Sequence, residues 1–282
     1  MTGALVSDVR DPRLAPFRDL AAAVRRRRAA LAGRVPRAGG PDDLVVVEGE
    51  LPVGRLLAAG WEVRTVLLTP AHAATLESLL AATAARGAQV LLAEHALLEE
   101  LTGLRHDRGC FATCPRPRWA PAPPRELVAA LAARGRSTIV VAERVTDPTN
   151  LGALIRNARA FGSDLLLCDE RAADPLDPRA VRTSAGQVFA LPICVPKDLV
   201  AAAVALRDEL HGALVAATTG DATPVERYRR PAHVLLALGS EGEGLSPALL
   251  AAADARVTVP LAGGVDSLNV AAATAVLLHA LR

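Results

Sequence analysis

The sequence contains very little lysine: Lys197 is the only one, and nearly all other basic residues are arginines. We interpret this bias, together with the abundance of alanine, as a mark of a GC-rich genome and not of function. The formal net charge of the 282 residues is only +2, so the charge of the whole chain does not indicate a nucleic-acid-binding protein. A local basic surface is still compatible with this balance.

Disulfide and metal-binding patterns are also missing. The four cysteines, at positions 110, 114, 168 and 194, form no CxxC pair and no zinc spacing, and the histidines are scattered without an HExxH motif. We therefore expect no metal site. The cysteines are more simply explained as small buried side chains in a reducing compartment.

Signals for membranes and export are absent as well. No uncharged apolar run is long enough to span a bilayer. Residues 1–14 carry Asp8, Arg10, Asp11 and Arg13 and lack the apolar segment of a signal peptide. We expect a cytoplasmic protein that has no membrane partner.

Hydrophobic residues, by contrast, make up 51% of the chain, enough for a sizeable core without disulfides. The length allows two domains. The clearest boundary is the proline-rich stretch 115–124, because prolines at this density favour extended chain. We predict an N-terminal domain over residues 1–114, a linker over 115–125 and a second domain over 126–282.

Apolar runs alternate with helical patterns in both halves, which predicts an α/β fold. In the N-terminal half we expect strands over 44–47, 63–68, 88–93 and 110–114 and helices over 14–32, 51–59, 71–86 and 95–101. In the C-terminal half we expect extended segments over 138–142, 165–168, 188–195, 213–217, 234–238 and 257–261 and helices over 126–133, 177–185 and 199–211, with others starting near Asn150 and after Asn269. The basic run Arg25–Arg28 and the loop 105–109 are as compatible with a solvated surface as with an RNA contact.

The stretch 234–282 is the main candidate for a ligand site. Two buried strands are each followed by a glycine-bearing loop, at 239–244 and 262–264, and then by a helix. Loops after the carboxyl ends of parallel strands bind ligands in open α/β sheets, and glycine allows a close approach of the backbone. The first loop has no GK[ST] sequence and lies too late for a dinucleotide fingerprint. Its two acids favour a neutral or cationic ligand.

Two other segments carry polar side chains at helix starts. Asn150 suits a helix N-cap, and Arg156 and Arg159 follow it at helical spacing, an arrangement that can bind a nucleic-acid phosphate. Either Asp266 or Ser267 suits the cap of the last helix. Taken singly, each segment is more simply explained as a turn, a cap or a solvated arginine.

Taken together, in this order and spacing, the segments resemble the three motifs of the SpoU (TrmH-like) branch of the SPOUT RNA methyltransferases. The matching residues are Asn150-x-Gly152-x-x-x-Arg156-x-x-x-x-Phe161-Gly162, Leu238-Gly239-Ser240-Glu241-Gly242-x-Gly244-Leu245 and Val259-Pro260-Leu261-Ala262-Gly263-x-x-x-Ser267-Leu268-Asn269-Val270. The resemblance covers residues 137–281. The N-terminal half is similar, more loosely, to the substrate-binding domain of these enzymes at Val47-Glu48-Gly49, Leu67-Leu68-Thr69 and His106-x-x-Gly109. This half points to the 23S rRNA enzymes of the thiostrepton-resistance type.

The resemblance implies an enzyme that transfers a methyl group from S-adenosylmethionine to a ribose 2′-hydroxyl of RNA. It also implies a parallel sheet with a C-terminal trefoil knot, a smaller N-terminal α/β RNA-binding domain like a ribosomal protein, and a homodimer whose active site is completed across the interface. The cofactor residues that it implies are Leu238, Gly239, Ser240, Gly244, Val259, Leu261, Ser267 and Leu268. The catalytic residues that it implies are Asn150, Arg156, Glu241, Ser267 and Asn269.

The chemistry limits the roles of these residues. Arginine keeps its proton to above pH ~12, so we expect Arg156 to stay cationic, to hold the target phosphate and to stabilise the developing oxyanion. Glu241 or a water molecule then accepts the proton. Ala271 and Ala280 depart from the family pattern and affect only supporting hydrogen bonds. The alternatives are a tRNA methyltransferase and a catalytically idle RNA-binding or ribosome-assembly protein.

Overall fold

The computed structural model describes residues 3–18, 20, 43–103, 109–240, 242–263 and 265–282. These residues form two compact units. One contains the described residues up to Arg118 together with Ala185–Ala190, and the other contains Trp119–Ser184 and Leu191–Arg282. The division falls inside the proline-rich stretch. The basic run Arg25–Arg28, most of the helix expected over 14–32 and most of the loop 105–109 lie outside the described residues.

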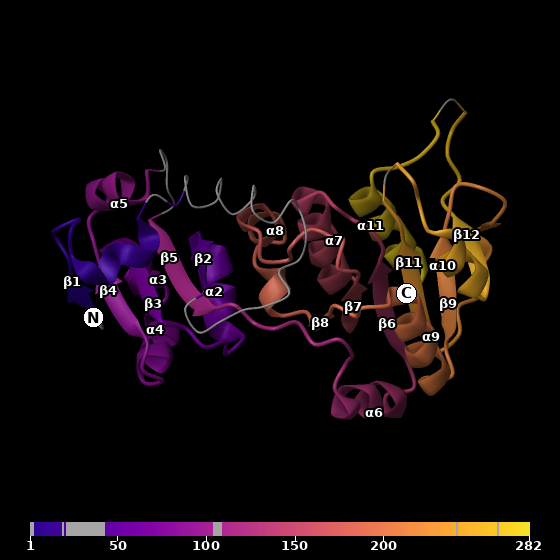
Figure 1. Cartoon of the computed structure of the whole chain (residues 1–282), viewed down its shortest axis with the longest axis horizontal. Coiled ribbons are helices and arrows are strands. Elements are labelled where there is room, and N and C mark those ends of the chain that lie inside the picture. Colours follow the sequence, from indigo (N-terminus) through magenta and orange to yellow (C-terminus); the bar gives the residue numbers. More distant parts are fainter. Residues whose placement is uncertain (1–2, 19, 21–42, 104–108, 241, 264) are drawn as a thin grey trace. The chain divides into compact units, whose positions relative to one another are not determined.

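The N-terminal unit is built on a five-stranded mixed sheet (Figure 1) with the order β1-β4-β3-β5-β2. The strands are β1 (Ala4–Leu5), β2 (Leu44–Glu48), β3 (Thr65–Leu68), β4 (Gln89–Leu92) and β5 (Cys110–Pro115). β1, β4 and β3 run parallel, whereas β5 is antiparallel to both β3 and β2. The α/β interpretation of this half is therefore correct, and the last strand closes the sheet between two earlier ones.

Short helices cover this sheet: η1 (Pro12–Phe17), α2 (Glu50–Ala58), α3 (Pro70–Thr75), α4 (Glu77–Ala84) and α5 (His95–Thr102). The single helix expected over 71–86 is wrong, because the backbone of Leu76 leaves helical geometry (φ −104°, ψ 14°). Residues 188–195 are also not one extended segment. They begin inside the 3₁₀ turn η2 (Gln187–Phe189), where the rings of Trp61 and Phe189 pack edge to face, 5.1 Å apart. Trp61 and Phe189 are far apart in the sequence, so the residues around 189 carry no local signal of this turn.

The C-terminal unit contains a seven-stranded sheet with the order β10-β12-β9-β11-β6-β7-β8. Its strands are β6 (Ser137–Ala142), β7 (Leu165–Cys168), β8 (Ile193–Cys194), β9 (Ala213–Ala217), β10 (Thr223–Pro224), β11 (His233–Leu238) and β12 (Ala255–Thr258). All neighbouring pairs are parallel. The central strands β6 and β11 are apolar along most of their length and buried on both faces, as parallel strands between helical layers must be.

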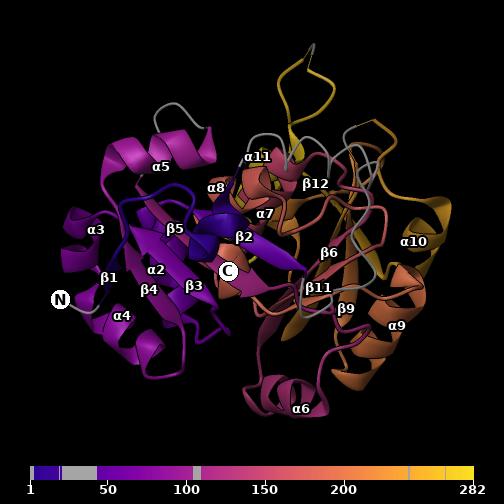
Figure 2. The ribbon, with the colours of Figure 1, turned by 60° about the vertical axis from the view of Figure 1, so that its left-hand side comes forward.

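The helices of this unit are α6 (Arg125–Ala133), α7 (Pro148–Ala160), α8 (Pro178–Thr183), α9 (Leu199–Glu209), η3 (Val225–Arg227), α10 (Pro247–Ala252) and α11 (Val270–Ala280). Figure 2 shows α7, α8 and α11 on one side of the sheet and α9 and α10 on the other. α7 packs closely on α8 at Gly152. A Cβ at this position would lie only 2.5 Å from the carbonyl oxygen of Ala180, so the close approach requires glycine. Gly152 therefore serves helix packing, whereas Arg156 and Arg159 on the same helix are exposed.

One strand boundary near the C-terminus differs from expectation. β12 ends at Thr258 instead of continuing to Leu261, since Pro260 cannot donate a hydrogen bond to the sheet. The helix expected after the loop at 239–244 is present as the short α10, whose N-terminus is capped by the hydroxyl of Ser246. It covers the sheet with Leu249, which is fully buried.

The four cysteines are buried, as expected, and none of them forms a disulfide. Burial raises the pKa of Cys110 and Cys114 to about 12 and that of Cys194 to about 11. Thiols with such high pKa values behave as apolar side chains at neutral pH. Among the described residues, no helix is both long and apolar enough to cross a membrane.

Candidate functional site

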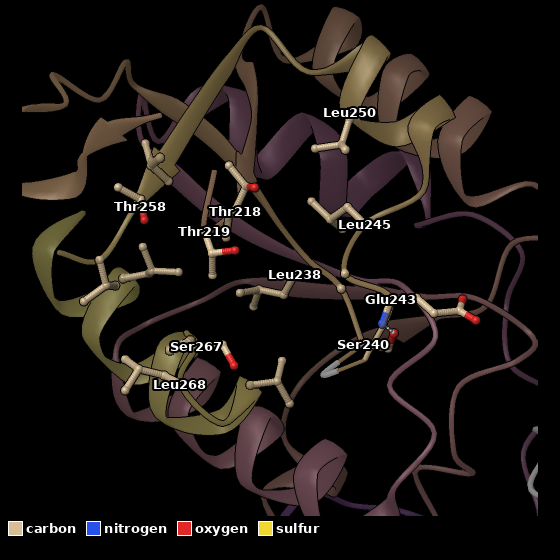
Figure 3. Close-up of a pocket in the computed structure, with 18 of the residues that line it drawn as sticks. Thr218, Thr219, Leu238, Ser240, Glu243, Leu245, Leu250, Thr258, Ser267 and Leu268 are labelled. Carbon is tan, nitrogen blue, oxygen red and sulfur yellow. Dashed lines mark hydrogen bonds between the residues drawn. The ribbon is translucent and has the colours of Figure 1, made fainter. Parts of the chain in front are cut away.

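The carboxyl edge of the large sheet carries a pocket of about 340 Å³, a volume in the range of small-molecule sites. The ends of β9, β11 and β12 and the start of α11 line it. Figure 3 shows Thr219 and Leu238 pointing into this space, whereas the carboxylate of Glu243 points out of it. Each residue expected to hold a cofactor lines this pocket: Leu238, Gly239, Ser240, Gly244, Val259, Leu261, Ser267 and Leu268.

The loop after β11 folds back on itself at the pocket. A Cβ at Gly239 would lie 2.2 Å from the carbonyl carbon of Gly244 and 2.4 Å from the amide nitrogen of Leu245. These are backbone atoms that cannot rotate away, so only glycine fits at 239. The hydroxyl of Ser240 accepts a hydrogen bond from the backbone N–H of Glu243 at 3.3 Å, which tightens the turn.

A second pocket of about 500 Å³ adjoins the first, since Ser240, Gly242, Glu243 and Val270 line both. Its other residues come from the loop after β6, the start of α7 and Arg171 in the loop after β7. Asn150 is among them, so one of the expected catalytic residues lies beside the expected cofactor residues.

The first and third sequence motifs meet through a pair of asparagines. The side-chain amide of Asn269 donates a hydrogen bond to Oδ1 of Asn150 at 3.0 Å. Oδ1 of Asn269 accepts from the backbone N–H groups of Ala271 and Ala272, so Asn269 fixes the start of α11 and reaches α7 with the same side chain. The contact joins residues 119 positions apart in the chain.

Both helix caps differ from those expected. α7 is capped by Asp147, whose carboxylate accepts from the N–H groups of Thr149 and Asn150. Pro148 occupies the first helical position, so the Asp-Pro pair was the signal in the sequence. α11 is capped by Asn269 and not by Asp266 or Ser267. Neither Asn150 nor Ser267 is therefore the N-cap of its helix.

The other expected catalytic residues are placed differently. Ser267 is exposed and lines the first pocket. Arg156 is exposed on α7 and lines neither pocket, and it makes no hydrogen bond or ion pair to the part of the chain that the structure describes. Glu241 lies outside the described residues.

Two residues that follow β6, Glu143 and Arg144, bind the loop after β11 through its residues 243–246. The carboxylate of Glu143, which is 8% exposed, accepts from the backbone N–H of Ser246 at 2.6 Å. The guanidinium of Arg144 forms an ion pair with Glu243 and donates to the carbonyl of Gly244 at 3.3 Å. The loop is therefore anchored at its middle and at its end.

The backbone of Arg144 is strained. Its φ of 56° lies in the left-handed region, a conformation that costs a non-glycine residue about 1–3 kcal/mol. The N–H of Arg144 donates to Oδ1 of Asp169 at 3.1 Å, which helps to hold the conformation. Burial raises the pKa of that carboxyl group.

Sequence reasoning missed several of these residues. Thr218 and Thr219 line the first pocket after β9, and Arg144 and Arg171 line the second. Their common signal is the position directly after a buried strand, the same signal that identified the loop at 239. Only the order of strands in the sheet shows which of these strand ends are neighbours.

Residues 137–279 match the SpoU rRNA Methylase family. An uncharacterized tRNA/rRNA methyltransferase of Mycobacterium tuberculosis is 33% identical over 277 residues, which are 97% of this chain and 90% of that protein. The fold is similar to the crystal structure of an AdoMet-bound rRNA methyltransferase from Sinorhizobium meliloti (TM-score 0.75, 25% identity, 98% of this chain and 96% of that one). It is also similar to an RNA 2′-O ribose methyltransferase (TM-score 0.67, 26% identity, 98% and 97% of the two chains).

These matches include the strands, loops and helices that form both pockets and, for each of the relatives, nearly the whole chain. The chain therefore belongs to the SpoU rRNA methylase family of RNA methyltransferases.

Proposed function

We propose that this protein is an S-adenosylmethionine-dependent methyltransferase that acts on a ribose 2′-hydroxyl of RNA, with 23S ribosomal RNA as substrate. The observation that carries the proposal is the pair of adjoining pockets. One is lined by all the expected cofactor residues. The other is lined by Asn150, which accepts a hydrogen bond from Asn269. Of the similar structures, one is named an AdoMet-bound rRNA methyltransferase and another an RNA 2′-O ribose methyltransferase.

The first pocket fits S-adenosylmethionine. Its described lining contains hydroxyl groups of Thr218, Thr219, Ser240 and Ser267, apolar side chains and backbone, but no arginine or lysine. Glu243 also lines the pocket, but its carboxylate points out of it (Figure 3) and pairs with Arg144. Such a lining suits a ligand with a cationic sulfonium and an uncharged adenosine, and it would be poor for a pyrophosphate. The glycine at 239 lets the backbone approach a flat group.

S-adenosylmethionine supplies an electrophilic methyl group on a sulfonium. The protein has to place the ribose hydroxyl in line with that group, and positioning of this kind supplies much of the rate. The hydrogen bond between Asn150 and Asn269, together with the bonds of Asn269 to the start of α11, fixes both side chains beside the pockets, where they can orient the ribose.

We assign to Arg156 the role of holding the target phosphate and stabilising the developing oxyanion, because its guanidinium stays protonated. Because Arg156 is exposed on α7 and lies outside both pockets of its own chain, this role requires the homodimer, in which the site is completed across the interface. Glu241 or a water molecule accepts the proton of the hydroxyl. The proposal includes a homodimer that completes this site and the C-terminal trefoil knot. It also gives the N-terminal unit an RNA-binding role.

The exposed side of α11 supports the dimer. The helix is apolar at nearly all positions, a composition typical of helices that are buried all round. Ala272, Val276 and Ala280 are nevertheless exposed, with Val276 at 40%. A second copy of the chain would cover this side.

The decisive experiment measures transfer of labelled methyl from S-adenosylmethionine to unmodified 23S ribosomal RNA and, separately, to bulk tRNA. We expect label in ribosomal RNA that survives alkali as a methylated dinucleotide and is lost with Arg156→Ala. Label in tRNA alone would keep the chemistry and overturn the substrate. Absence of both cofactor binding and transfer would favour an idle RNA-binding protein.

A further inference from the structure

We propose that Arg144 and Arg171 form a phosphate-binding site in the second pocket, which holds the RNA backbone beside the target ribose. This inference rests on the proposed function, since it names how that site holds its substrate. Both side chains line the pocket that also contains Asn150. They come from the loops after β6 and β7, which are neighbouring strands of the sheet.

The conformation of Arg144 is the first observation. A left-handed backbone favours glycine, which would adopt it without strain. An arginine in this strained conformation, at the lining of a pocket, points to a role for its side chain. The hydrogen bond from its N–H to Asp169 holds the backbone whatever the side chain is, so the role belongs to the guanidinium.

The surroundings of that guanidinium are the second observation. The side chain of Arg144 is 22% exposed, while that of its ion-pair partner Glu243 is 74% exposed. Its Nε–H is buried and meets no acceptor within the described structure. The arginine is thus held in place, whereas the carboxylate of Glu243 lies largely in water. An anion that binds the guanidinium through two oxygens can replace Glu243 at little cost in free energy.

The charge balance of the pocket is the third observation. The carboxylate of Asp147 is occupied by two backbone N–H groups of α7, and Glu243 is paired with Arg144. Arg171 is exposed and, among the described residues, has no hydrogen bond or ion pair. The pocket therefore offers an unsatisfied guanidinium beside an exchangeable one. A phosphodiester matches the forked donors of arginine.

The location selects RNA phosphate as the ligand. The pocket shares Ser240 and Glu243 with the proposed cofactor pocket, so a ribose presented to the cofactor lies at their junction and its flanking phosphates face the second pocket. Glu243 would act as the counter-ion of Arg144 until RNA displaces it.

The test measures binding of the full-length protein to transcribed 23S ribosomal RNA at several KCl concentrations, with S-adenosylmethionine binding followed separately. We expect Arg171→Ala and Arg144→Gly each to weaken RNA binding roughly tenfold. Each should also lower the slope of log Kd against log [KCl] by about 0.7–1, the loss of one phosphate contact. Arg144→Gly suits the left-handed backbone and should fold. Glu243→Gln should tighten RNA binding by up to about fivefold.

Arg256→Ala is the matched control, because Arg256 is also exposed, lies on β12 and lines neither pocket. RNA affinity and salt slope of Arg171→Ala equal to those of this control would overturn the phosphate site. Weaker RNA binding by Glu243→Gln would overturn the exchange of counter-ions. Failure of the wild-type protein to bind S-adenosylmethionine or transfer methyl would instead overturn the proposed function.

Discussion

At the scale of single residues, burial decides the chemistry of the cysteines. Burial raises the pKa of Cys110 from 9.0 to about 12, and a Glu50 charge adds to this. A thiol is neutral when protonated, so its contribution to stability is complete below about pH 9 and is lost as the pH rises towards 12. Between these pH values the thiol ionises in the unfolded chain but not in the folded one, and this ionisation favours unfolding.

We therefore expect the free energy of unfolding in urea to fall above pH 9, with Cys110 contributing about 1.4 kcal/mol per pH unit. Measured from pH 10 to 11, where the unfolded thiol is ionised and the folded one is not, the slope should be smaller by about that amount in Cys110→Ala than in the wild type. Equal slopes in the two proteins would show that the thiol ionises in the folded state.

Gly239 has a steric role that can be tested in the same way. Because its added Cβ would overlap the backbone of Gly244 and Leu245, Gly239→Ala should force the loop to move. We expect S-adenosylmethionine binding to weaken roughly tenfold or more, measured by calorimetry. Gly263→Ala is the control, since a Cβ there meets no described atom within 4 Å. Similar affinities for both variants would contradict the tight turn.

At the scale of elements, one arginine ties the end of α11 to the sheet. The guanidinium of Arg230 donates to Oγ1 of Thr138 at 3.0 Å and to the carbonyl of Leu281 at 2.8 Å. It also donates to the carbonyls of Ser137 and Ala232 at 2.8 Å each. Burial, and then the nearby charge of Arg136, lower the pKa of Arg230.

Arg230→Ala would remove these hydrogen bonds at once, so we expect it to destabilise the protein by about 2–3 kcal/mol in urea unfolding. Arg136→Ala is the matched control. Arg136 is exposed and only adds like charge, so its removal should change stability by less than about 0.5 kcal/mol. A loss of the same size in both variants would assign the effect to net charge and not to hydrogen bonds.

At the scale of the whole molecule, the proposed dimer depends on the exposed side of α11. Val276→Asp would place a charge at its centre, and we expect the variant to sediment as a monomer where the wild type sediments as a dimer. Leu51→Asp is the control, because Leu51 is 54% exposed and lies on α2 in the other unit. A wild-type monomer, or a dimer that survives Val276→Asp, would exclude this side of α11 as the interface.

The sequence by itself predicted most of the strands and helices and the loop that lines the first pocket. Buried strands such as Leu165–Cys168 and Ala213–Ala217 have the bounds that their apolar runs predict, because a strand buried on both faces needs a continuous apolar run. The glycines at 239 and 244 marked the first pocket for a similar local reason. The family followed from motif order.

Tertiary structure alone decided which of these pieces meet. The Arg144–Glu243 pair depends on β6 and β11 being neighbours, and the Asn150–Asn269 hydrogen bond depends on the packing of α7 against α11, although the residues of each pair lie about a hundred positions apart. The 3₁₀ turn at Phe189 likewise depends on Trp61. Periodicity reports only which face of an element is buried, and strand order is set by packing across the whole domain. Strand pairing therefore brought the arginines of the second pocket together, whereas the sequence placed each of them only in its own loop.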